Sequence, residues 1–485
     1  MIEKIISIQN IGRFIDYNVK PENGWNGSFS KVNIIYAPNG FGKTTLATIL
    51  KSLAQNEPQL IEFKESFNSQ SQPYISIKVK GVPGVIEFKD NKWSRSLPNL
   101  EIFDIHFIED YLFVGSILSK KHKTNLFKLL LNEEGLKLRS ECKALITKKI
   151  NSENRLKKQK TKNEEAKITS IGLEKLNSDL STALGKYYSY SKPIFDQQIV
   201  LTNKYLRGFA PYIVLEEFSH QKDSTLFETF RIFITLKVHG QRVQFLAPDI
   251  HRKQPNAKFT LSEGDKSAFA VSFFLAAIER IGYNGKIIIF DDPISSFDYN
   301  RKNATISTLA RLCNEISQFF LLTHDIFFAK EFTEKMKFEN CLNLKLANNG
   351  TTSYLVKHEI FVETLNGIQK DLLTVKKYLA EGANKEIELR EVIRCIRPIL
   401  EGHFKLKYFD TIQNNHWLGD IINQIRESDN ASRLFRLKKL LPELIELNDY
   451  CKQYHHSSFD STSDIVNPVE LKQYIDLLLK TIDEI

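Results

Sequence analysis

One short stretch near the N-terminus constrains the fold more than any other part of the chain. A buried, apolar run, VNIIY at residues 32–36, leads into APNGFGKTT and then into the helical pattern LATILKSLA. A strand, a tight turn with two glycines and a helix, in that order, make the local unit of an α/β sheet, because a parallel strand needs a crossover connection. The sequence therefore predicts an α/β fold in which this turn lies at the end of a strand.

The turn fits the phosphate-binding pattern GxxxxGK[ST], except that Ala37 takes the place of the first glycine. Its glycines let backbone N–H groups close around phosphate oxygens. Lys43 supplies a charge for the β- and γ-phosphates, and the Thr44 hydroxyl is a ligand for Mg²⁺. The alternative is a glycine turn without a ligand. The residues predicted to bind ATP and Mg²⁺ here are Asn39, Gly40, Gly42, Lys43, Thr44 and Thr45.

Two further strand ends carry polar residues that suit the same site. KIIIFDD places Asp291 at the end of a buried strand, where it would hold Mg²⁺ through water, and Asp292 beside it, where it would orient or deprotonate the attacking water. QFFLLTHD places His324 within reach of a γ-phosphate. Each pattern has a plainer alternative: a strand-to-turn signal for the aspartates, and a structural role for a single histidine.

The segment LSEGDK precedes a long apolar helix and is richer in polar residues than a helix cap requires. With the other motifs, in this order, it resembles the signature of ABC-type ATPases that act in DNA repair and chromosome maintenance. The resemblance implies that Ser262 and Gly264 complete the ATP site of an opposite subunit, in a head-to-tail homodimer with ATP in the interface. SSFD, ending at Asp298, resembles the D-loop of that family.

The chain departs from this family at three points. Glu263 and Asp265 differ from the usual LSGGE signature, and Asp292 stands where the family has Glu. The shorter side chain predicts slow ATP hydrolysis. The Q-loop is expected near Phe107–Phe113, but this segment contains no Gln, so the coupling residue stays unassigned.

The motifs APNGFGKTTL, LSEGDK and DDPISSFD more narrowly resemble ATPases of bacterial antiviral defence, the PrrC-type anticodon nucleases and the PtuA-type subunits of Septu and retron-linked systems. In the first group, an Arg-x3-Glu and a later His form an RNase site. Here RPILE gives Arg397 and Glu401, and QYHHSS gives His455 and His456. A histidine would serve as acid or base, and Arg would stabilise the phosphate.

Three readings of the function stay open. The chain is a dimeric, ATP-controlled RNase that cleaves tRNA, or a PtuA-like scaffold that recruits a separate nuclease such as an HNH subunit, or a DNA-repair ATPase. The short helical insertion disfavours the last. An Arg–Glu pair at i,i+4 is also a common surface ion pair, and Pro398 would start or kink a helix there. Contact with nucleic acid, tRNA or DNA, is expected, and an assembly above the dimer stays open.

The overall pattern predicts an ABC-type ATPase head, with a mixed sheet, interrupted by a helical insertion and followed by an all-helical C-terminal domain. IISIQNIGRF, LEIFDIHF (Leu100–Phe107) and FRIFITLKV are expected strands, and LNLKLANNGTTSYLVK is an expected hairpin turning at Asn-Gly. The expected divisions are 1–118 and 200–357 for the two lobes of the head, 119–199 for the insertion, and 358–485 for the C-terminal effector or partner-binding domain.

Composition adds weaker constraints. The formal net charge of +9 permits contact with a polyanion, although lysine-rich helices also produce such an excess. The chain has no apolar run long enough to cross a bilayer, and its N-terminus does not resemble a signal peptide. Five scattered cysteines favour a reducing compartment. The expected location is therefore the cytoplasm, without membrane contact.

Overall fold

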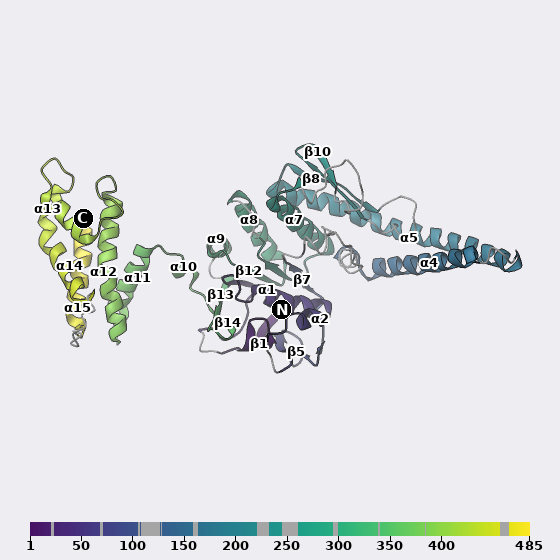
Figure 1. Ribbon diagram of the computed structural model, residues 1–485, viewed down its shortest axis with the longest axis horizontal. Helices are drawn as coiled ribbons and strands as arrows, with labels where there is room; N and C mark the ends of the chain where they lie inside the picture. The colour runs from purple at the N-terminus through teal and green to yellow at the C-terminus, as the bar shows by residue number, and fades with distance from the viewer. Residues whose placement is uncertain are drawn as a thin grey trace. The chain divides into compact units, whose positions relative to one another are not determined.

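The computed structural model describes residues 1–20, 24–67, 71–104, 107, 127, 129–158, 163–220, 232–244, 260–293, 299–337, 340–383, 385–455 and 465–485. They form two compact units, residues 1–360 and 361–485 (Figure 1). Within these described ranges, no helix is both long and apolar enough to pass through a membrane.

A mixed sheet of six strands forms the centre of the first unit, in the order β14-β13-β3-β12-β11-β7. All neighbours are parallel except β14, which runs antiparallel to β13. The strands are β3 (Val32–Tyr36), β7 (Leu100–Phe103), β11 (Ile287–Asp291), β12 (Gln318–Thr323), β13 (Cys341–Asn348) and β14 (Ser353–Lys357). Because β3, β7, β11 and β12 are parallel neighbours, their carboxyl ends meet along one edge.

A second, antiparallel sheet packs over helix α1 (Lys43–Gln55) in the order β2-β1-β4-β5-β6. Its strands are β1 (Ile2–Ile11), β2 (Phe14–Asn18), β4 (Tyr74–Val79), β5 (Ile86–Lys89) and β6 (Lys92–Trp93), and the short helix α2 (Gln59–Glu62) follows α1. One core joins Ile8 of this sheet, Leu50 of α1 and Ile289 of the central sheet. Helix α1 is therefore held between two sheets, which fixes its N-terminus at the phosphate loop.

The expected strand IISIQNIGRF is in fact a hairpin. Backbone φ angles of 58° at Asn10 and 55° at Gly12 turn the chain, so that Phe14 pairs back with Ile11. Gly12 adopts the left-handed conformation that favours glycine. In the sequence this glycine stands inside a largely apolar run, so the turn is not apparent from the pattern.

Three helices cover the other face of the central sheet: α7 (Glu263–Ile281), α8 (Tyr299–Glu315) and α9 (Ile326–Met336). Phe290 of β11 meets Phe274 of α7 edge-on, with ring centroids 5.5 Å apart. Phe319 of β12 stacks on Phe332 of α9 at 5.7 Å. These aromatic contacts hold α7 and α9 against the face of the central sheet.

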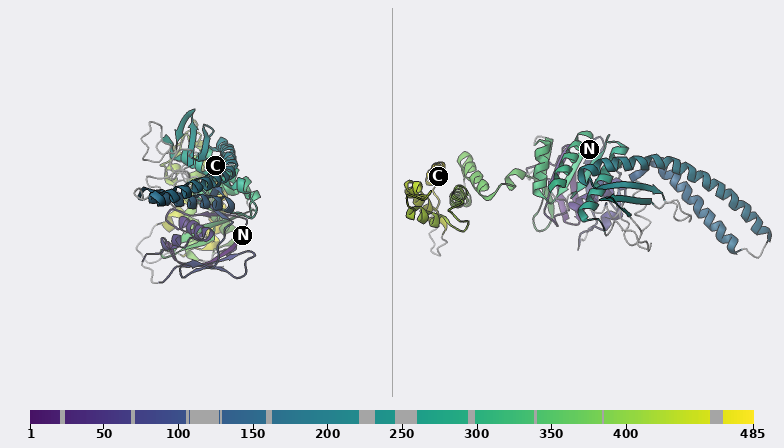
Figure 2. Two further views of the ribbon diagram at one scale, coloured as in Figure 1. Left: turned by 90° about the vertical axis from the view of Figure 1, so that its right-hand side faces the viewer. Right: turned by 90° about the horizontal axis from the view of Figure 1, so that it is seen from above.

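The insertion is a pair of helices, α4 (Glu133–Lys158) and α5 (Asn163–Phe209), which run side by side as an arm (Figures 1 and 2). Helix α5 continues to Phe209, beyond the expected limit at residue 199. A small sheet, β10-β9-β8, stands at its root, formed by β8 (Ile213–His220), β9 (Ile232–Val238) and β10 (Gln241–Gln244). Strand β8 was not expected from its acidic sequence IVLEEFSH.

Every regular element among the described residues of the second unit is a helix or a 3-10 turn, as the sequence predicts. The helices are α11 (Gly367–Glu381), α12 (Glu386–Lys407), α13 (Leu418–Glu427), the 3-10 turn η4 (Phe435–Leu440), α14 (Leu441–His455) and α15 (Pro468–Glu484), and α10 (Ile360–Glu363) lies at the junction. Helix α12 packs against α11, α13, α14 and α15, and it continues through Pro398.

The turn at Gly12 gives a test of how closely the second sheet supports α1. A Cβ atom at Gly12 would lie 2.8 Å from Oγ1 of Thr45, which is closer than real contacts allow. We expect Gly12→Ala to lower the free energy of unfolding by about 2–3 kcal/mol, from left-handed strain plus this clash. The measurement is urea unfolding by tryptophan fluorescence in a Trp417→Phe background, since the remaining Trp25 and Trp93 both lie in the first unit.

Gly81→Ala is the matched control, because Gly81 has φ 79° and nothing within 4 Å of the added Cβ. Only the backbone strain, about 1 kcal/mol, should then appear. Equal losses in the two variants would contradict close packing of the turn on α1.

Candidate functional site

The phosphate loop lies where the sequence predicts it, between β3 and α1. Gly40 and Gly42 have φ angles of 83° and 103°, in the left-handed region that favours glycine. A Cβ at Gly42 would lie 3.0 Å from the Phe14 ring, so this position is also closed by packing. Asn39 is exposed in the loop, and Thr45 is buried against the Gly12 turn.

Lys43 lies inside the loop, and its side chain is only 5% exposed. Its Nζ donates hydrogen bonds to the carbonyl oxygens of Ala37, at 2.8 Å, and Pro38, at 3.3 Å. Oδ2 of Asp292 lies 3.8 Å away. The ammonium group is thus held by loop carbonyls and a carboxylate, at the centre of the predicted phosphate site.

Asp291 ends β11 and is almost wholly buried. Burial raises the pKa of its carboxyl group to about 7, and the charge of Asp292 adds to this, while a hydrogen bond with the Thr44 side chain opposes it. Its Oδ1 atom is buried without a hydrogen-bond partner. A buried carboxyl with an unpartnered oxygen is costly unless a cation or donor joins it.

These observations fit a Mg²⁺ ion. Mg²⁺ is usually held by one or two protein oxygens and completed by water and substrate phosphates. The Thr44 hydroxyl and Asp291, which already contact each other, would hold it, as the sequence predicts. The ion would also supply the positive charge that restores Asp291 to its ionised form.

Asp292 and His324 form a close pair at neighbouring strand ends. Oδ1 of Asp292 accepts hydrogen bonds from the backbone N of His324, at 2.9 Å, and lies 2.8 Å from its ring Nδ1. Because an ionised carboxylate only accepts, Nδ1 carries the proton, and Nε2 is directed elsewhere. Asp292 holds this place with φ 49°, which is unusual for a residue other than glycine.

Asp104 also belongs to this edge, although its sequence pattern alone does not indicate a site residue. The expected strand Leu100–Phe107 would have enclosed it, but β7 ends at Phe103. Strands β7 and β11 are parallel, and Phe103 pairs with Phe290. The next residue in each case, Asp104 after β7 and Asp291 on β11, therefore lies at the same edge of the sheet. Oδ2 of Asp104 accepts a 2.8 Å hydrogen bond from Lys51 of α1, and its charge further raises the pKa of Asp291.

The expected Q-loop, residues 107–113, lies outside the described residues except for Phe107. The aspartate that ends the segment LEIFD is the only sequence feature that could have indicated Asp104 as a site residue. Its position at the site depends on the pairing of β7 with β11, which the sequence of one strand does not show.

The signature-like segment opens α7. Ser262 is the N-cap, and its Oγ accepts a 3.1 Å hydrogen bond from the backbone N of Asp265. Gly264 is buried in the first turn, whereas Glu263 is exposed and paired with Lys266 at 2.6 Å. The residue expected in the D-loop, Asp298, lies outside the described residues.

Asp265 is fixed from two sides. Its Oδ1 accepts hydrogen bonds from the Tyr212 hydroxyl, at 2.5 Å, and from Arg301, at 2.7 Å. Burial favours the neutral carboxyl, but these hydrogen bonds prevail and hold its pKa below the usual value. Asp265, a departure from the resembled signature, therefore ties the start of α7 to two other elements.

In the C-terminal unit, Arg397 and Glu401 share one face of α12, as their spacing predicts, with 4.0 Å between Nη2 and Oε1. Glu401 is 7% exposed, and its Oε1 accepts a 2.9 Å hydrogen bond from the backbone N of Leu418 at the start of α13. The carboxylate is thus engaged in joining two helices. His455 is the last residue of α14, and His456 lies outside the described residues.

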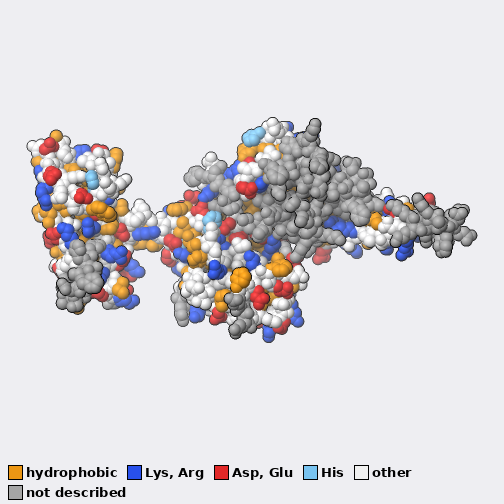
Figure 3. Space-filling view, viewed as in Figure 1, with side chains coloured by type: hydrophobic (Ala, Val, Ile, Leu, Met, Phe, Trp, Pro, Cys, Tyr) orange, Lys and Arg blue, Asp and Glu red, His pale blue; other side chains and the backbone are white. Residues whose placement is uncertain are grey.

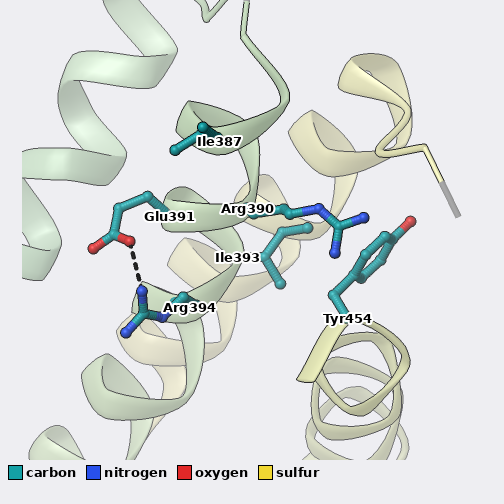
Figure 4. A pocket seen from close by; sticks show the side chains of 6 residues that line it. All are labelled: Ile387, Arg390, Glu391, Ile393, Arg394 and Tyr454. Atoms are coloured by element: carbon teal, nitrogen blue, oxygen red, sulfur yellow. Dashed lines mark hydrogen bonds and ion pairs between the residues drawn. The ribbon is translucent and has the colours of Figure 1, made fainter. Parts of the chain in front are cut away.

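A pocket of about 350 Å³ lies near the start of α12 and the end of α14 (Figure 4). Arg390 and Tyr454 face each other across it, while Arg394 pairs with Glu391 at 3.0 Å. Arg390 in turn bonds Glu386 at 2.9 Å. The two arginines are therefore balanced by acids.

The charge of this unit is mixed on the face that Figure 3 shows. Lys and Arg side chains are interspersed with Asp and Glu among the visible described residues, without one continuous basic stripe.

Comparison with known proteins gives one family match. A family model described as an AAA domain matches residues 248–457, which is less than half of the chain. No curated protein matches the chain.

Among solved structures, the Smc head domain from Pyrococcus furiosus, crystallised with the C-terminal domain of ScpA, is 14% identical, with a TM-score of 0.40, and the match covers 78% of this chain and 99% of that one. RecF bound to ATP, from the RecFOR pathway, is 14% identical, with a TM-score of 0.44, and the match covers 71% and 95%.

The family match and the site geometry agree. A phosphate loop, a strand-end aspartate pair and a strand-end histidine lie along one edge of a mixed sheet, with a helical arm between the two halves of the head. These features support an ATPase, at whose site ATP and Mg²⁺ would bind.

The raised pKa of Asp291 makes a prediction about pH. The folded protein holds a proton at Asp291 up to about pH 7, but the unfolded chain releases it near the ordinary value of 3.8. The contribution of this group to stability is therefore full below about pH 4 and is lost as the pH rises through 7. Without nucleotide, we expect the melting temperature of Asp291→Asn to rise relative to the natural chain between pH 5 and pH 8, by roughly a few degrees.

With ATP and Mg²⁺ present at pH 8, we expect the natural chain to melt at a higher temperature than Asp291→Asn. Binding then stabilises only the chain that retains the carboxylate. A melting difference without nucleotide that does not change with pH would contradict the buried, protonated state of Asp291.

Proposed function

We propose that this chain is a slow ATP hydrolase that works as a homodimer, and that its nucleotide state controls a nuclease in bacterial defence against phage. The observation that carries the ATPase part is the constellation of Lys43, Asp292 and His324 at one sheet edge. The antiviral part is supported by the order of the motifs in the sequence and by the separate helical unit.

In the proposed site, each residue has a distinct task. The loop N–H groups and Lys43 bind the β- and γ-phosphates, in place of the carbonyls that Lys43 contacts here. Asp292 orients the attacking water, and His324, fixed by Asp292, directs Nε2 toward the γ-phosphate. Mg²⁺, held by Thr44 and Asp291, would supply positive charge for the phosphates.

Slow turnover follows from the packing around Asp292. Its carboxylate is shorter than that of Glu, and it is already engaged by His324 and lies near Lys43. A base held in this way takes a proton from water less readily than one with both oxygens available. The site is thus better suited to a long-lived ATP state than to rapid cycling.

The second half of each site would come from the other subunit. Ser262 and the buried Gly264 present the N-terminus of α7, whose N–H groups and dipole favour a phosphate. ATP would then lie between the phosphate loop of one chain and this turn of the other, so that ATP binding drives dimerisation.

For the effector, the geometry favours the scaffold over an intrinsic RNase. Glu401 is buried and accepts a hydrogen bond from the start of α13, so its carboxylate is poorly placed for proton transfer, and Arg397 lies 4.0 Å from it. The helical unit would then dock a separate nuclease, such as an HNH subunit. The RNase alternative keeps one favourable observation, the pocket with Arg390 and Tyr454 near the end of α14, close in sequence to His455 and His456.

The test is incubation of the purified chain with total tRNA and Mg²⁺–ATP, following both phosphate release and RNA integrity. We expect slow phosphate release, abolished by Lys43→Ala, and intact tRNA. Discrete tRNA cuts that disappear in a His455→Ala/His456→Ala chain would instead establish the RNase and overturn the scaffold. Arg426→Gln is the control for the histidine variant. It removes an exposed cation of α13 that does not line the pocket, and it should leave any tRNA cleavage unchanged. Absence of any ATP hydrolysis would reject the ATPase itself.

A further inference from the structure

Two adjacent cationic residues in the first turn of α8 hold two different parts of the ATP machinery. Arg301 donates a 2.7 Å hydrogen bond to Asp265 at the start of α7, and Lys302 forms an ion pair with Asp325. Neighbouring residues on a helix point about 100° apart, so one turn can contact two loops at once. Neither residue was singled out from the sequence.

The Arg301 contact reaches the signature-like turn. Asp265 accepts from Arg301 through its side chain, while its backbone N donates to Oγ of Ser262. Both charged side chains are only 14% exposed, so solvent screens the pair weakly. The Tyr212 hydroxyl, which also bonds Arg301, adds a third member from the root of the arm. The position of Ser262 is thus tied to α8 through one carboxylate.

The Lys302 contact reaches the edge that carries the phosphate loop. Asp325 is the N-cap of α9, accepting from the backbone N atoms of Phe327 and Phe328, each at 3.0 Å. It follows directly after His324, whose ring meets Asp292. Lys302 therefore supports the loop that sets the His324 side chain.

We propose that the first turn of α8 mechanically joins the two half-sites of one chain, with Arg301 and Lys302 as positioning residues. This rests on the proposed function, in which the Ser262 turn serves the ATP of the opposite subunit. A shift of the His324 loop when ATP binds then moves the Ser262 turn of the same chain, and coupling of this kind is reciprocal. The two ATP sites of a dimer should therefore act cooperatively.

The experiment compares the natural chain with Arg301→Gln and Lys302→Met in three assays. These are binding of a fluorescent ATP analogue to the dilute monomer, ATP-dependent dimerisation by sedimentation, and the dependence of phosphate release on ATP concentration. We expect Arg301→Gln to weaken dimerisation about tenfold, because a charge-assisted hydrogen bond is lost, while monomer affinity changes by less than about twofold. In both variants, a Hill coefficient above one should fall toward one.

Two further variants separate positioning from general stability. Tyr212→Phe removes only a hydroxyl from the Asp265 cluster and should weaken dimerisation in the same direction even if Arg301→Gln folds poorly. Tyr205→Phe is the matched control. It also removes one tyrosine hydroxyl, which donates a 2.6 Å hydrogen bond to Glu279 near the end of α7, whereas Asp265 lies at the start of α7. It should leave dimerisation and cooperativity unchanged.

The outcomes are distinct. Dimerisation and cooperativity like those of the natural chain in both the Arg301 and Tyr212 variants would overturn the inference and leave the proposed function intact. An equal loss in Tyr205→Phe would also overturn it, since the effect would then be a general loosening of α7. A natural chain that stays monomeric with ATP would reject the proposed dimer and this inference together.

Discussion

Lys43 carries its positive charge into a space almost closed to solvent, and the rest of the site is arranged around it. A buried ammonium is costly unless it is paired, and here two loop carbonyls and Asp292 provide the pairing. Gly40 and Gly42, which follow these carbonyls in the loop, adopt the positive φ angles that favour glycine. The buried acid Asp291 lies next to it, and nucleotide with Mg²⁺ would satisfy the charges of both.

The parallel sheet explains why so few residues make a site. Strands β3, β7, β11 and β12 end together, so each contributes its next residue to the same edge. Helix α1, clamped between two sheets, aims its N-terminus along that edge. The helices on the opposite face then bring in the signature-like turn and, through α8, connect it back to the strand ends.

Much of this could be predicted from the sequence, because the relevant signals are local. The loop, Asp291, Asp292 and His324 each follow an apolar run whose end can be read directly, and the helical C-terminal unit shows a helical period throughout. The interactions of Asp104, Arg301 and Tyr212 could not be predicted in this way. Their partners lie on other elements, so their roles depend on strand register and helix packing that no single segment encodes.

Arg397 and Glu401 of the C-terminal unit show that a sequence motif can be placed correctly without its function being known. Arg397 and Glu401 do share a helix face, as their spacing indicates, but a face has no function until its neighbours are known. Here the neighbour is the first turn of α13, which takes the Glu401 carboxylate as a hydrogen-bond acceptor. A motif of charged residues in a helical bundle is therefore weaker evidence for catalysis than a motif at a strand end.

In the proposed dimer each ATP site is shared between two chains, and a mixture of two inactive variants distinguishes this arrangement from two separate sites. Lys43→Ala lacks the phosphate-loop half, and Ser262→Arg lacks the signature half. Each alone should be inactive, whereas an equal mixture contains dimers with one intact composite site. Phosphate release should then return to at most about a quarter of the natural rate, because half of the dimers are mixed and each has one of two sites. A mixture no more active than its separate components would contradict the shared site.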